Sequence, residues 1–314
     1  MDAFSDVLRS VRLKGGVFLD ARFTAPWCVH SRVVAEDCKP ILQNPAQMIS
    51  YHYVTEGQIL IAVAGEDPIG VEAGEIVILP RNDPHIVGSS RNLRPINGRA
   101  LIQPSADGGL ARIDYGGGGA PARIICGFLG SDEGYNPLIA TLPAIIKIDV
   151  RAAAARGLIE ASLEYAAKEI AQGRVGSPAD LAQLSELLFV EAVRHYASTL
   201  PEEAGGWLKG LNDPQVGQAL VLIHADIATR WSVEDLAKSV AMSRSAFMNR
   251  FTSLIGMPPI KYLTTLRLNA AKTILVQSSK TVAQVAFSVG YESEDAFSRA
   301  FKREFGASPA NWRA

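Results

Sequence analysis

Residues 281–312 read TVAQVAFSVGYESEDAFSRAFKREFGASPANW, and this stretch decides the fold of the C-terminal part of the chain. Apolar residues recur at helical spacing until Gly290 interrupts the pattern, and a second helix is expected to begin at Ser293. The apolar stripe of that second helix consists of Phe297, Phe301 and Phe305. The pattern therefore predicts a helix, a short turn and a second helix. Glycine at the break suits a turn that needs a positive φ or a close backbone approach.

The second predicted helix has a polar face opposite its phenylalanine stripe. This face carries Glu294, Asp295, Ser298, Arg299 and Lys302. A helix face with cations and hydrogen-bonding groups can lie in the major groove of DNA. The alternative, for this stretch alone, is an ordinary helical hairpin whose charged face is solvated.

A second copy of the pattern lies at residues 231–258, which read WSVEDLAKSVAMSRSAFMNRFTSLIGMP. Leu236 matches Val285 at an offset of 49 residues, while Phe247 matches Phe297 at an offset of 50, so the two turns differ by one residue. Each copy ends in glycine followed by proline, which stops a helix. The duplication predicts two DNA-reading motifs on one chain, separated by a stiff helix over residues 260–277.

The segments DLA, MSRSAFMNRF, GMPPIKYL and VGYESEDAFSRAFKREFGASP resemble the C-terminal DNA-binding domain of AraC-type transcription regulators. The resemblance implies a seven-helix domain whose recognition helices, residues 243–254 and 293–305, enter successive major-groove faces on one side of the duplex. By position in the motif, the base-facing residues are Ser245, Met248 and Asn249 in the first helix and Glu294, Asp295 and Arg299 in the second.

These side chains have the chemistry that base recognition needs. Asparagine bonds adenine through two hydrogen bonds, methionine contacts the thymine methyl group, and arginine suits guanine. Further DNA-binding candidates beside them are Arg244, Arg250 and Lys302, of which Lys302 would meet backbone phosphate. Each charged residue in this set is alternatively a plain solvated charge.

Charge is distributed unevenly along the chain. The whole sequence has a formal net charge of -1, but residues 213–314 hold 12 Lys and Arg against 8 Asp and Glu. Residues 1–212 hold 19 Lys and Arg against 24 Asp and Glu. A positive C-terminal part and a negative N-terminal part are expected if only the C-terminal third of the chain contacts phosphate.

Length and composition favour two domains with well-formed cores, because the chain has 314 residues of which 48% are hydrophobic. We find no apolar run of about 18 residues, and residues 1–16 read as an amphipathic helix and not as a signal peptide. Three cysteines without a CxxC motif fit a reducing compartment. We expect a cytoplasmic protein that does not enter a membrane.

Before residue 150 the apolar pattern shortens to the length of strands. Strands are expected over residues 17–19, 25–27, 49–54, 58–64, 75–79, 101–103 and 123–128. Many short strands with glycine-rich turns predict a small antiparallel barrel or jelly roll. The glycine run at residues 116–119 is expected to be a surface loop, because it lacks the Lys-Ser/Thr that a phosphate-binding P-loop needs.

Residues 52–57 (HYVTEG) and 74–85 (GEIVILPRNDPH) resemble the two signature motifs of cupins. The resemblance implies the cupin-type domain that precedes the DNA-binding domain in many bacterial AraC-type regulators. Enzymatic cupins hold a metal with three His and one Glu, and here the matching positions are His52, Glu56, His85 and Ser50. Serine is a poor ligand for a borderline metal, so the alternative is a polar pocket or a satisfied core histidine. We expect no metal and no cofactor.

A barrel of this size can hold one small ligand, so an organic effector is expected. The candidates for the wall of its pocket are Arg22, Phe23, Trp27, Cys28, His52 and His85. Trp27 either stacks on a flat ligand or belongs to the core. Cys28, with His30 nearby, is either a reactive sensor or a buried inert thiol. Nothing in the sequence names the ligand.

From residue 151 the composition changes to alanine-rich helix, which predicts a helical hairpin with a Gly-Ser-Pro turn at residues 176–178. The second helix of the hairpin has an apolar face made of Leu181, Leu184, Leu188 and Ala192, widened by Leu187, Val190 and Val193. This hairpin either packs on the barrel or forms a dimer interface, as the resemblance implies. Residues 201–213 are expected to be a linker.

We therefore expect an α+β protein. A cupin-like antiparallel β-barrel (1–150) is followed by a helical hairpin and linker (151–212) and an all-α domain with two helix-turn-helix motifs (213–314). The expected function is a non-enzymatic transcription regulator with four partners: double-stranded promoter DNA, a small-molecule effector, RNA polymerase and a second copy of the chain. Two alternatives remain open: a metal-dependent cupin enzyme fused to a DNA-binding domain, and a constitutive DNA-binding dimer without an effector.

Overall fold

The computed structural model describes residues 13–39, 42, 45–104, 110–131, 139, 141–152, 178–200 and 206–313. The chain divides into two compact units. The barrel unit contains residues 13–131 and 142–199, and the helical unit contains residues 200–314. The expected helix at residues 1–16 lies outside the described residues except for its last four positions, and most of the first helix of the hairpin, residues 153–172, also lies outside them.

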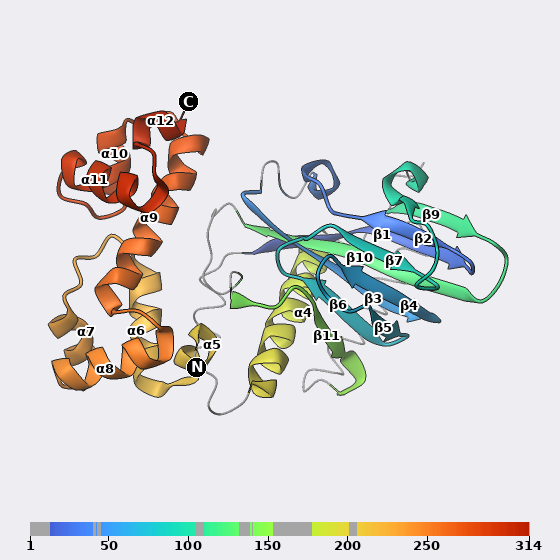
Figure 1. Ribbon diagram of the computed structural model, residues 1–314, viewed down its shortest axis with the longest axis horizontal. Helices are drawn as coiled ribbons and strands as arrows, with labels where there is room; N and C mark the ends of the chain where they lie inside the picture. The colour runs from blue at the N-terminus through green and yellow to red at the C-terminus, as the bar shows by residue number, and fades with distance from the viewer. Residues whose placement is uncertain are drawn as a thin grey trace. The chain divides into compact units, whose positions relative to one another are not determined.

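Two facing sheets build the barrel unit (Figure 1). The six-stranded sheet runs in the spatial order β11 (Ile146–Asp149), β6 (Glu75–Leu79), β3 (Gln47–Glu56), β10 (Pro121–Ser131), β1 (Lys14–Thr24) and β9 (Ala111–Gly116). The five-stranded sheet runs in the order β5 (Ile69–Glu72), β4 (Gln58–Val63), β7 (His85–Gly88), β2 (Cys28–Ser31) and β8 (Ile96–Asn97). The expected antiparallel barrel is confirmed for most strand pairs, whereas β1 pairs β9 and β2 pairs β8 in parallel.

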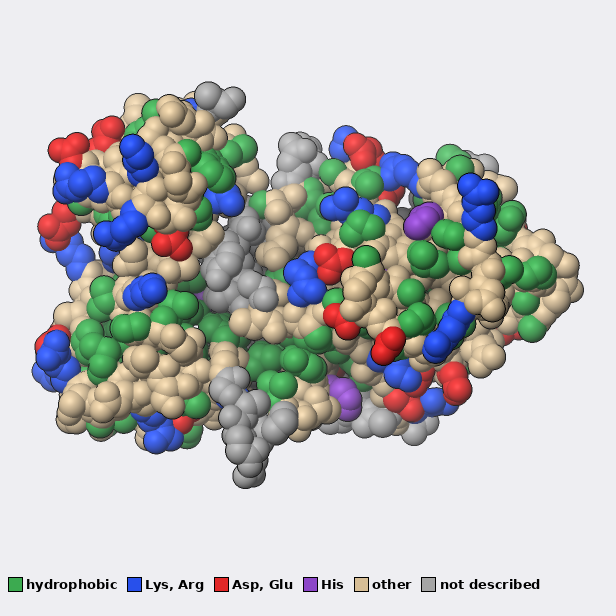
Figure 2. Space-filling model, in the orientation of Figure 1, with side chains coloured by type: hydrophobic (Ala, Val, Ile, Leu, Met, Phe, Trp, Pro, Cys, Tyr) green, Lys and Arg blue, Asp and Glu red, His purple; other side chains and the backbone are tan. Residues whose placement is uncertain are grey.

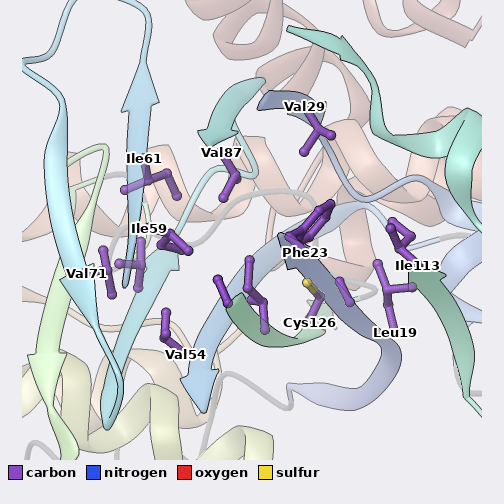
Figure 3. Close-up of a cluster of buried hydrophobic side chains, with 14 of the residues drawn as sticks. Leu19, Phe23, Val29, Val54, Ile59, Ile61, Val71, Val87, Ile113 and Cys126 are labelled. Carbon is purple, nitrogen blue, oxygen red and sulfur yellow. The ribbon is translucent and has the colours of Figure 1, made fainter. Parts of the chain in front are cut away.

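The core of the barrel unit lies between these two sheets. Val54 and Cys126 contribute to it from the six-stranded sheet, and Ile61, Val71 and Val87 contribute from the five-stranded one (Figure 3). Side chains alternate between the two faces of a strand, so the strands with one outward polar face bury every second residue. β4, for example, reads exposed, buried, half-buried, buried, half-buried, buried from residue 58 to residue 63.

Two of the expected strands are wrong. Residues 25–27 form a bend between β1 and β2, because Pro26 has no amide hydrogen to donate to a strand partner. In the expected strand 101–103, Leu101 ends the 3-10 helix η2 (Gly98–Leu101), whose start the Asn97 side chain caps by accepting from the Arg99 amide, and Gln103 makes an isolated antiparallel bridge with Arg112. The structure also contains the 3-10 helices η1 (Ala35–Cys38) and η3 (Val150–Ala152).

Helix α4 (Pro178–Thr199) is the second helix of the expected hairpin, and it packs on β1, β10 and β11. Phe189, Ala192 and Val193 are fully buried on the face that meets the sheet. Burying such an apolar stripe against a sheet is the usual way that a helix is held in an α+β domain. The side chains of Leu181, Leu184 and Leu188 lie outside the described residues.

The helical unit contains eight described helices. They are α5 (Trp207–Asn212), α6 (Pro214–Ala225), α7 (Val233–Ser239), α8 (Arg244–Ile255), α9 (Pro259–Gln277), α10 (Val282–Ser288), α11 (Glu294–Phe305) and α12 (Pro309–Arg313). Helix α9 runs through the unit from the α6–α8 end to the α10–α12 end (Figure 1). Its second half packs into one core with the two helices of the second motif, through Leu268, Ala271 and Leu275.

Two copies of one helix-turn-helix motif are confirmed, and their helix ends use the same capping groups. In the first motif (residues 232–256) Ser232 begins α7 with a capping box, and in the second motif (residues 281–306) Thr281 does the same for α10. Serine caps the second helix of each motif. Gly256 and Gly306 end those helices in the left-handed conformation, with φ of 80° and 76°.

The turns of the two motifs differ by the one residue that the sequence offsets predict. The first turn carries Ala241 at a φ of 55°, and the second carries Gly290 at a φ of 86°. One residue then separates Ala241 from the cap Ser243, whereas two separate Gly290 from the cap Ser293. Helices α8 and α11, the predicted recognition helices, therefore begin within a residue of the predicted positions.

The last six residues before Asp213, expected to be linker, form helix α5. Trp207 on α5 is buried, and its Nε1–H donates to the Tyr262 hydroxyl at 2.6 Å. The amide of Gly206 donates to the carbonyl of Leu254 at 2.8 Å, which ties the start of α5 to the end of α8. This segment therefore belongs to the core of the helical unit.

Candidate nucleic-acid interface and effector pocket

Helix α8 presents the expected base-facing residues on its outer side. Ser245 and Asn249 are exposed and Met248 is half-buried, while Phe247 and Phe251 on the opposite side are fully buried. Within the described part of the chain, no hydrogen bond or ion pair involves the Asn249 side chain. Its amide is therefore available to an external partner.

The two arginines of α8 have partners inside the helical unit. Arg244 Nε lies 2.5 Å from a carboxylate oxygen of Glu234 on α7. Arg250 donates from Nε and Nη2 to one oxygen of Asp213, at 2.8 and 2.5 Å. The other Asp213 oxygen caps α6 by accepting from the amides of Gln215 and Val216.

This dual role sets the ionisation of Asp213. Burial alone raises the pKa of Asp213, but the hydrogen bonds from Arg250 and from the two α6 amides outweigh it, so the pKa is lowered. Arg250 therefore fastens α8 to the start of α6, which gives this DNA-binding candidate an intramolecular function.

Helix α11 exposes all four of its candidates. Glu294, Asp295, Arg299 and Lys302 are exposed, and no ion pair or side-chain hydrogen bond involves them among residues 206–313. Phe297 and Phe301 are fully buried beneath them, as the stripe predicts. In Figure 2 acidic and basic side chains lie next to each other on the surface of the helical unit, which agrees with the modest positive charge of residues 213–314.

The barrel unit contains a cavity of about 260 Å³ between its two sheets. Its inner wall is apolar except for a buried histidine and thiol, and consists of Leu19, Ala21, Phe23, Val29, His52, Val87, Ile113, Ile124 and Cys126. Its rim is polar and includes His30, Arg32, Asn97 and Arg99. The volume is slightly below the range of about 300–1,000 Å³ that suits drug-sized ligands, so the space fits a small molecule.

A chain of hydrogen bonds begins at two residues of this wall, Cys126 and His52, and continues to His85. His85 Nδ1–H donates to the Asp83 carbonyl at 2.8 Å, because a carbonyl can only accept, and this leaves Nε2 of neutral His85 as an acceptor. His52 Nε2–H donates to that nitrogen across 2.7 Å. His52 Nδ1 then accepts from the Cys126 thiol at 3.1 Å. Each of these three hydrogen bonds therefore has one proton and a defined donor.

The ionisation of these three groups agrees with the hydrogen bonds. Burial and the neighbouring His85 lower the pKa of His52 well below 6.5, and burial lowers the pKa of His85. Burial raises the pKa of the Cys126 thiol far above its ordinary value. All three side chains are therefore neutral near pH 7, and His52 and Cys126 offer an uncharged polar spot in an apolar wall.

The other effector candidates lie in several places. Phe23 borders the cavity and stacks on Trp27, with ring centroids 3.8 Å apart. Trp27 is buried behind it and Cys28 is buried outside the lining, where burial raises the pKa of its thiol and disfavours a reactive thiolate. Arg22 borders a second, more open cavity of about 680 Å³ and lies 3.4 Å from Asp20.

The metal-ligand candidates are not brought together. Glu56 is exposed and borders the second cavity, while His52 and His85 lie 2.7 Å apart, nitrogen to nitrogen. Two imidazoles on one zinc would hold their nitrogens about 3.3 Å apart, from Zn–N distances of ~2.0–2.1 Å. Ser50 is buried, and its hydroxyl has no partner among the described residues. Those residues include no group of three His, Cys, Asp or Glu side chains that could hold a metal, so they do not fit the centre of enzymatic cupins.

The polar residues at the rim of the cavity were not predicted from the sequence. His30 and Arg32 lie at β2, and Asn97 and Arg99 lie at β8 and η2. The parallel pairing of β2 with β8 brings these segments together. Because parallel pairs are not joined by a local turn, no short-range pattern signals them. Cys126 was missed for a different reason: it meets His52 through the antiparallel β3–β10 pairing, and the two residues lie 74 positions apart in the sequence, so no local hairpin signals the contact.

The architecture defines a class of protein: a cupin-type barrel joined to a domain with two helix-turn-helix motifs. Comparisons with known proteins agree, because a cupin family model matches residues 2–198 and a helix-turn-helix domain model matches residues 236–314. An AraC-like transcription regulator of Streptomyces antibioticus is 31% identical over 314 residues, covering 100% of this chain and 98% of that protein.

A second relative also matches over the full length of the chain. The HTH-type transcriptional regulator AlkR of Acinetobacter baylyi is 30% identical over 329 residues, covering 100% of this chain and 99% of that protein. The solved DNA-binding domain of AdpA, in complex with a target DNA, is 35% identical and covers 32% of this chain and 90% of that chain, with a TM-score of 0.31. This chain belongs to the AraC family of DNA-binding transcription regulators and carries an N-terminal cupin domain. No helix within the described ranges is long and apolar enough to cross a membrane.

Proposed function

We propose that this regulator reads promoter DNA in the bacterial cytoplasm with both recognition helices, under the control of a small molecule in the barrel cavity. One observation supports DNA reading most directly. Helices α8 and α11 have the same caps and the same buried faces, and each exposes a residue, Asn249 or Arg299, that has no intramolecular partner in the described part of the chain. Duplicated geometry with free polar groups on equivalent faces suits two successive major grooves.

The proposed roles follow from the chemistry of each side chain. Asn249 pairs with an adenine edge and Met248 contacts a neighbouring thymine methyl group. Arg299 pairs with guanine, and Lys302 meets phosphate. Ser245, Glu294 and Asp295 complete the two reading surfaces. Arg244 and Arg250 have a smaller part in DNA binding, because their guanidinium groups already pair with Glu234 and Asp213.

The test is DNA binding to the region upstream of the chain's own gene, titrated with salt. Asn249→Ala and Arg299→Ala should each weaken specific binding by about 1–3 kcal/mol and leave the salt slope unchanged. The matched control is Lys302→Ala, which should weaken specific and random DNA alike and lower the salt slope by about one. Unchanged specific binding in Arg299→Ala would show that α11 grips only the backbone.

The cavity points to an effector that is small and largely apolar, with one hydrogen-bonding group. Such a molecule would bury its body among Leu19, Phe23 and Ile113 and place its polar group at the rim, because both ring nitrogens of His52 already have partners. The presence of this cavity favours ligand control over a constitutive dimer. The mismatch at Glu56 and Ser50 favours a regulator over a metal-dependent enzyme, which agrees with the regulator names of the relatives.

Thermal-shift titration of the full chain with small apolar alcohols, ketones and amides tests the effector site. Ala21→Leu fills the cavity and should abolish the shift, whereas Ala122→Leu alters the second cavity and should keep it. A ligand that stabilises both variants equally would place the site elsewhere.

We also propose a homodimer that contacts RNA polymerase. Sedimentation equilibrium at micromolar concentration tests the first part, and a monomer would contradict it.

A further inference from the structure

The two helix-turn-helix motifs are joined at a second place besides helix α9. Residues 226–231 form the loop between α6 and α7 on the side of the first motif, and residues 289–293 form the turn of the second motif. Arg267 on α9, the backbone of Ala228, Gly290, and the pair Arg230 and Glu292 connect this loop with this turn. We call these five residues the inter-motif brace.

Arg267 is the centre of the brace. Its guanidinium donates to three consecutive backbone carbonyls of the loop: Ile227 at 2.6 Å, Thr229 at 2.8 Å and Ala228 at 3.4 Å. Asp226 holds the same loop from the other side, because its carboxylate accepts from the Ala228 amide and the Thr229 hydroxyl, both at 2.8 Å. The loop that precedes α7 is therefore fixed onto the middle of α9.

Gly290 brings the second motif onto the same loop. A Cβ atom at this position would lie 2.6 Å from the Ala228 carbonyl oxygen and 2.9 Å from Arg267 Nη2. The equivalent position of the first motif is Ala241, which keeps a positive φ with a side chain. The left-handed turn therefore favours glycine without requiring it. The close approach of the second motif to the loop of the first adds a steric need for glycine at 290.

The pair Arg230 and Glu292 spans the same junction, with Nη1 and Oε1 2.8 Å apart. Both side chains are exposed, so water screens the attraction and the pair orients the junction more than it stabilises it. Helix α9 is the other connection, and its 19 residues extend about 28 Å at 1.5 Å per residue. A single helix fixes the distance between the two motifs, but a second connection is needed to fix the rotation of one motif relative to the other about the axis of that helix.

We propose that the inter-motif brace sets the separation and orientation of α8 and α11, and thereby selects the spacing of the two DNA half-sites that the chain accepts. The inference rests on the proposed function, because both helices must read DNA for spacing to matter. Arg267 and Gly290 are positioning residues in this scheme. They act on the arrangement of the two motifs and do not contact bases.

The first experiment measures the arrangement without DNA in the full chain. Spin labels on Ser253→Cys of α8 and Glu304→Cys of α11 report the distance distribution between the recognition helices, since both positions are exposed. The three native cysteines are buried, and labelling of the unsubstituted chain measures their background. Arg267→Met, which keeps an apolar stem and loses the donors, should broaden the distribution. Lys238→Met, which removes an exposed charge from α7, is the matched control and should not.

The second experiment measures affinity for the natural site, for sites whose half-sites are moved by one base pair, and for each half-site alone. If Arg267→Met reduces the competent arrangement to about one tenth of the population, affinity for the natural site falls about tenfold. Preference for the natural spacing should shrink, while affinity for single half-sites should stay within about twofold. Gly290→Ala should act in the same direction. Arg230→Glu should weaken the spacing preference, and adding Glu292→Arg should restore it.

The outcomes separate the brace from the proposed function. An unchanged distance distribution and an unchanged spacing preference in both Arg267→Met and Gly290→Ala, with melting temperatures confirming a folded helical unit, would overturn the brace. If the distance distribution broadens in Arg267→Met but the wild-type chain does not discriminate between DNA sites, the brace is supported and two-helix reading of DNA is overturned.

Discussion

The hydroxyl of Tyr262 connects three helices, and we expect its removal to destabilise the helical unit more than the size of one atom suggests. Trp207 Nε1 on α5 lies 2.6 Å from this oxygen, and His224 Nε2 on α6 lies 2.8 Å from it. An indole N–H can only donate, so the hydroxyl accepts from Trp207, and it can donate its own proton to Nε2 of neutral His224 when that imidazole carries its proton on Nδ1. Tyr262→Phe removes the shared oxygen from both partners.

The magnitude follows from the burial of those partners. Trp207 is 4% exposed, so water cannot replace the lost acceptor, and a buried unpaired donor costs about 1–3 kcal/mol. His224 is half-buried, and its lost hydrogen bond adds about 0.5–1.5 kcal/mol. We expect Tyr262→Phe to lower the free energy of unfolding of the helical unit by about 2–4 kcal/mol.

Urea unfolding followed by tryptophan fluorescence measures this change, because Trp207, Trp231 and Trp312 lie in the helical unit and Trp27 in the barrel unit. The matched control is Tyr291→Phe. The Tyr291 hydroxyl is buried and has no hydrogen-bond partner among the described residues, so its removal should be neutral or stabilising. Equal effects of the two substitutions would refute the reasoning, because hydroxyl loss would then cost the same with and without partners.

The pH dependence of the wild type gives an independent check. Burial lowers the pKa of His224 from 6.5 to about 4, so its contribution to stability is complete above pH 6.5 and is lost as the pH falls toward 4. At ~1.36 kcal/mol per pKa unit the loss reaches about 3 kcal/mol at pH 4. Tyr262→Phe should show a weaker pH dependence, because the neutral imidazole has lost its hydrogen-bond donor. A steeper dependence would contradict the assigned direction of the bond.

Three further predictions concern other parts of the chain. Ala241→Gly should raise the free energy of unfolding by about 0.5–1 kcal/mol in urea titrations, because relief of the left-handed alanine exceeds the entropy that glycine adds to the unfolded chain. Arg250→Ala and Asp213→Asn should each lower the free energy of unfolding, and the double variant should lose little more than either single one. The salt slope of DNA binding should be unchanged. If Arg250→Ala instead loses specific DNA affinity without losing stability, Arg250 is a base contact. Because the pKa values of His52 and His85 are depressed, the barrel unit should lose protection from hydrogen exchange at β3 and β7 as the pH falls below 6.5, and protection that rises on acidification would contradict this.

The helix-turn-helix motifs were predictable because local rules agree with one another there. The phenylalanine stripe of α11, its serine cap and its glycine stop all point to the same helix, and the copy at α8 repeats each signal. The six residues of α5 lie within the segment expected to be linker, and no side-chain hydrogen bond caps this helix at Gly206. Its Trp207 is held in the helical unit by a hydrogen bond to Tyr262, 55 residues further along the chain, which no local pattern signals.

The cavity was predictable as a feature of the barrel but not in its lining. His52 lines the cavity from an inward position on β3. Glu56 was expected on the same face, but β3 is bulged against β10 near its end, where Val54 pairs Ile124 and Glu56 pairs Arg123. A bulge shifts the alternation of side chains between faces. The position of the bulge depends on the partner strand β10 and cannot be predicted from the sequence of β3 alone.

Strand β1 has a consequence for the synthesis of the chain. It lies between β10 and β9 in its sheet, with Lys14 paired to Gly130 and Leu19 paired to Ala111. Both neighbours are therefore made roughly a hundred residues after β1 itself. At about 5–20 residues per second, the ribosome leaves this apolar strand without its partners for some 5–20 s. The barrel unit cannot complete its sheets before its last strands are made, whereas helices α8 and α11 are made of short-range contacts and can form as they emerge.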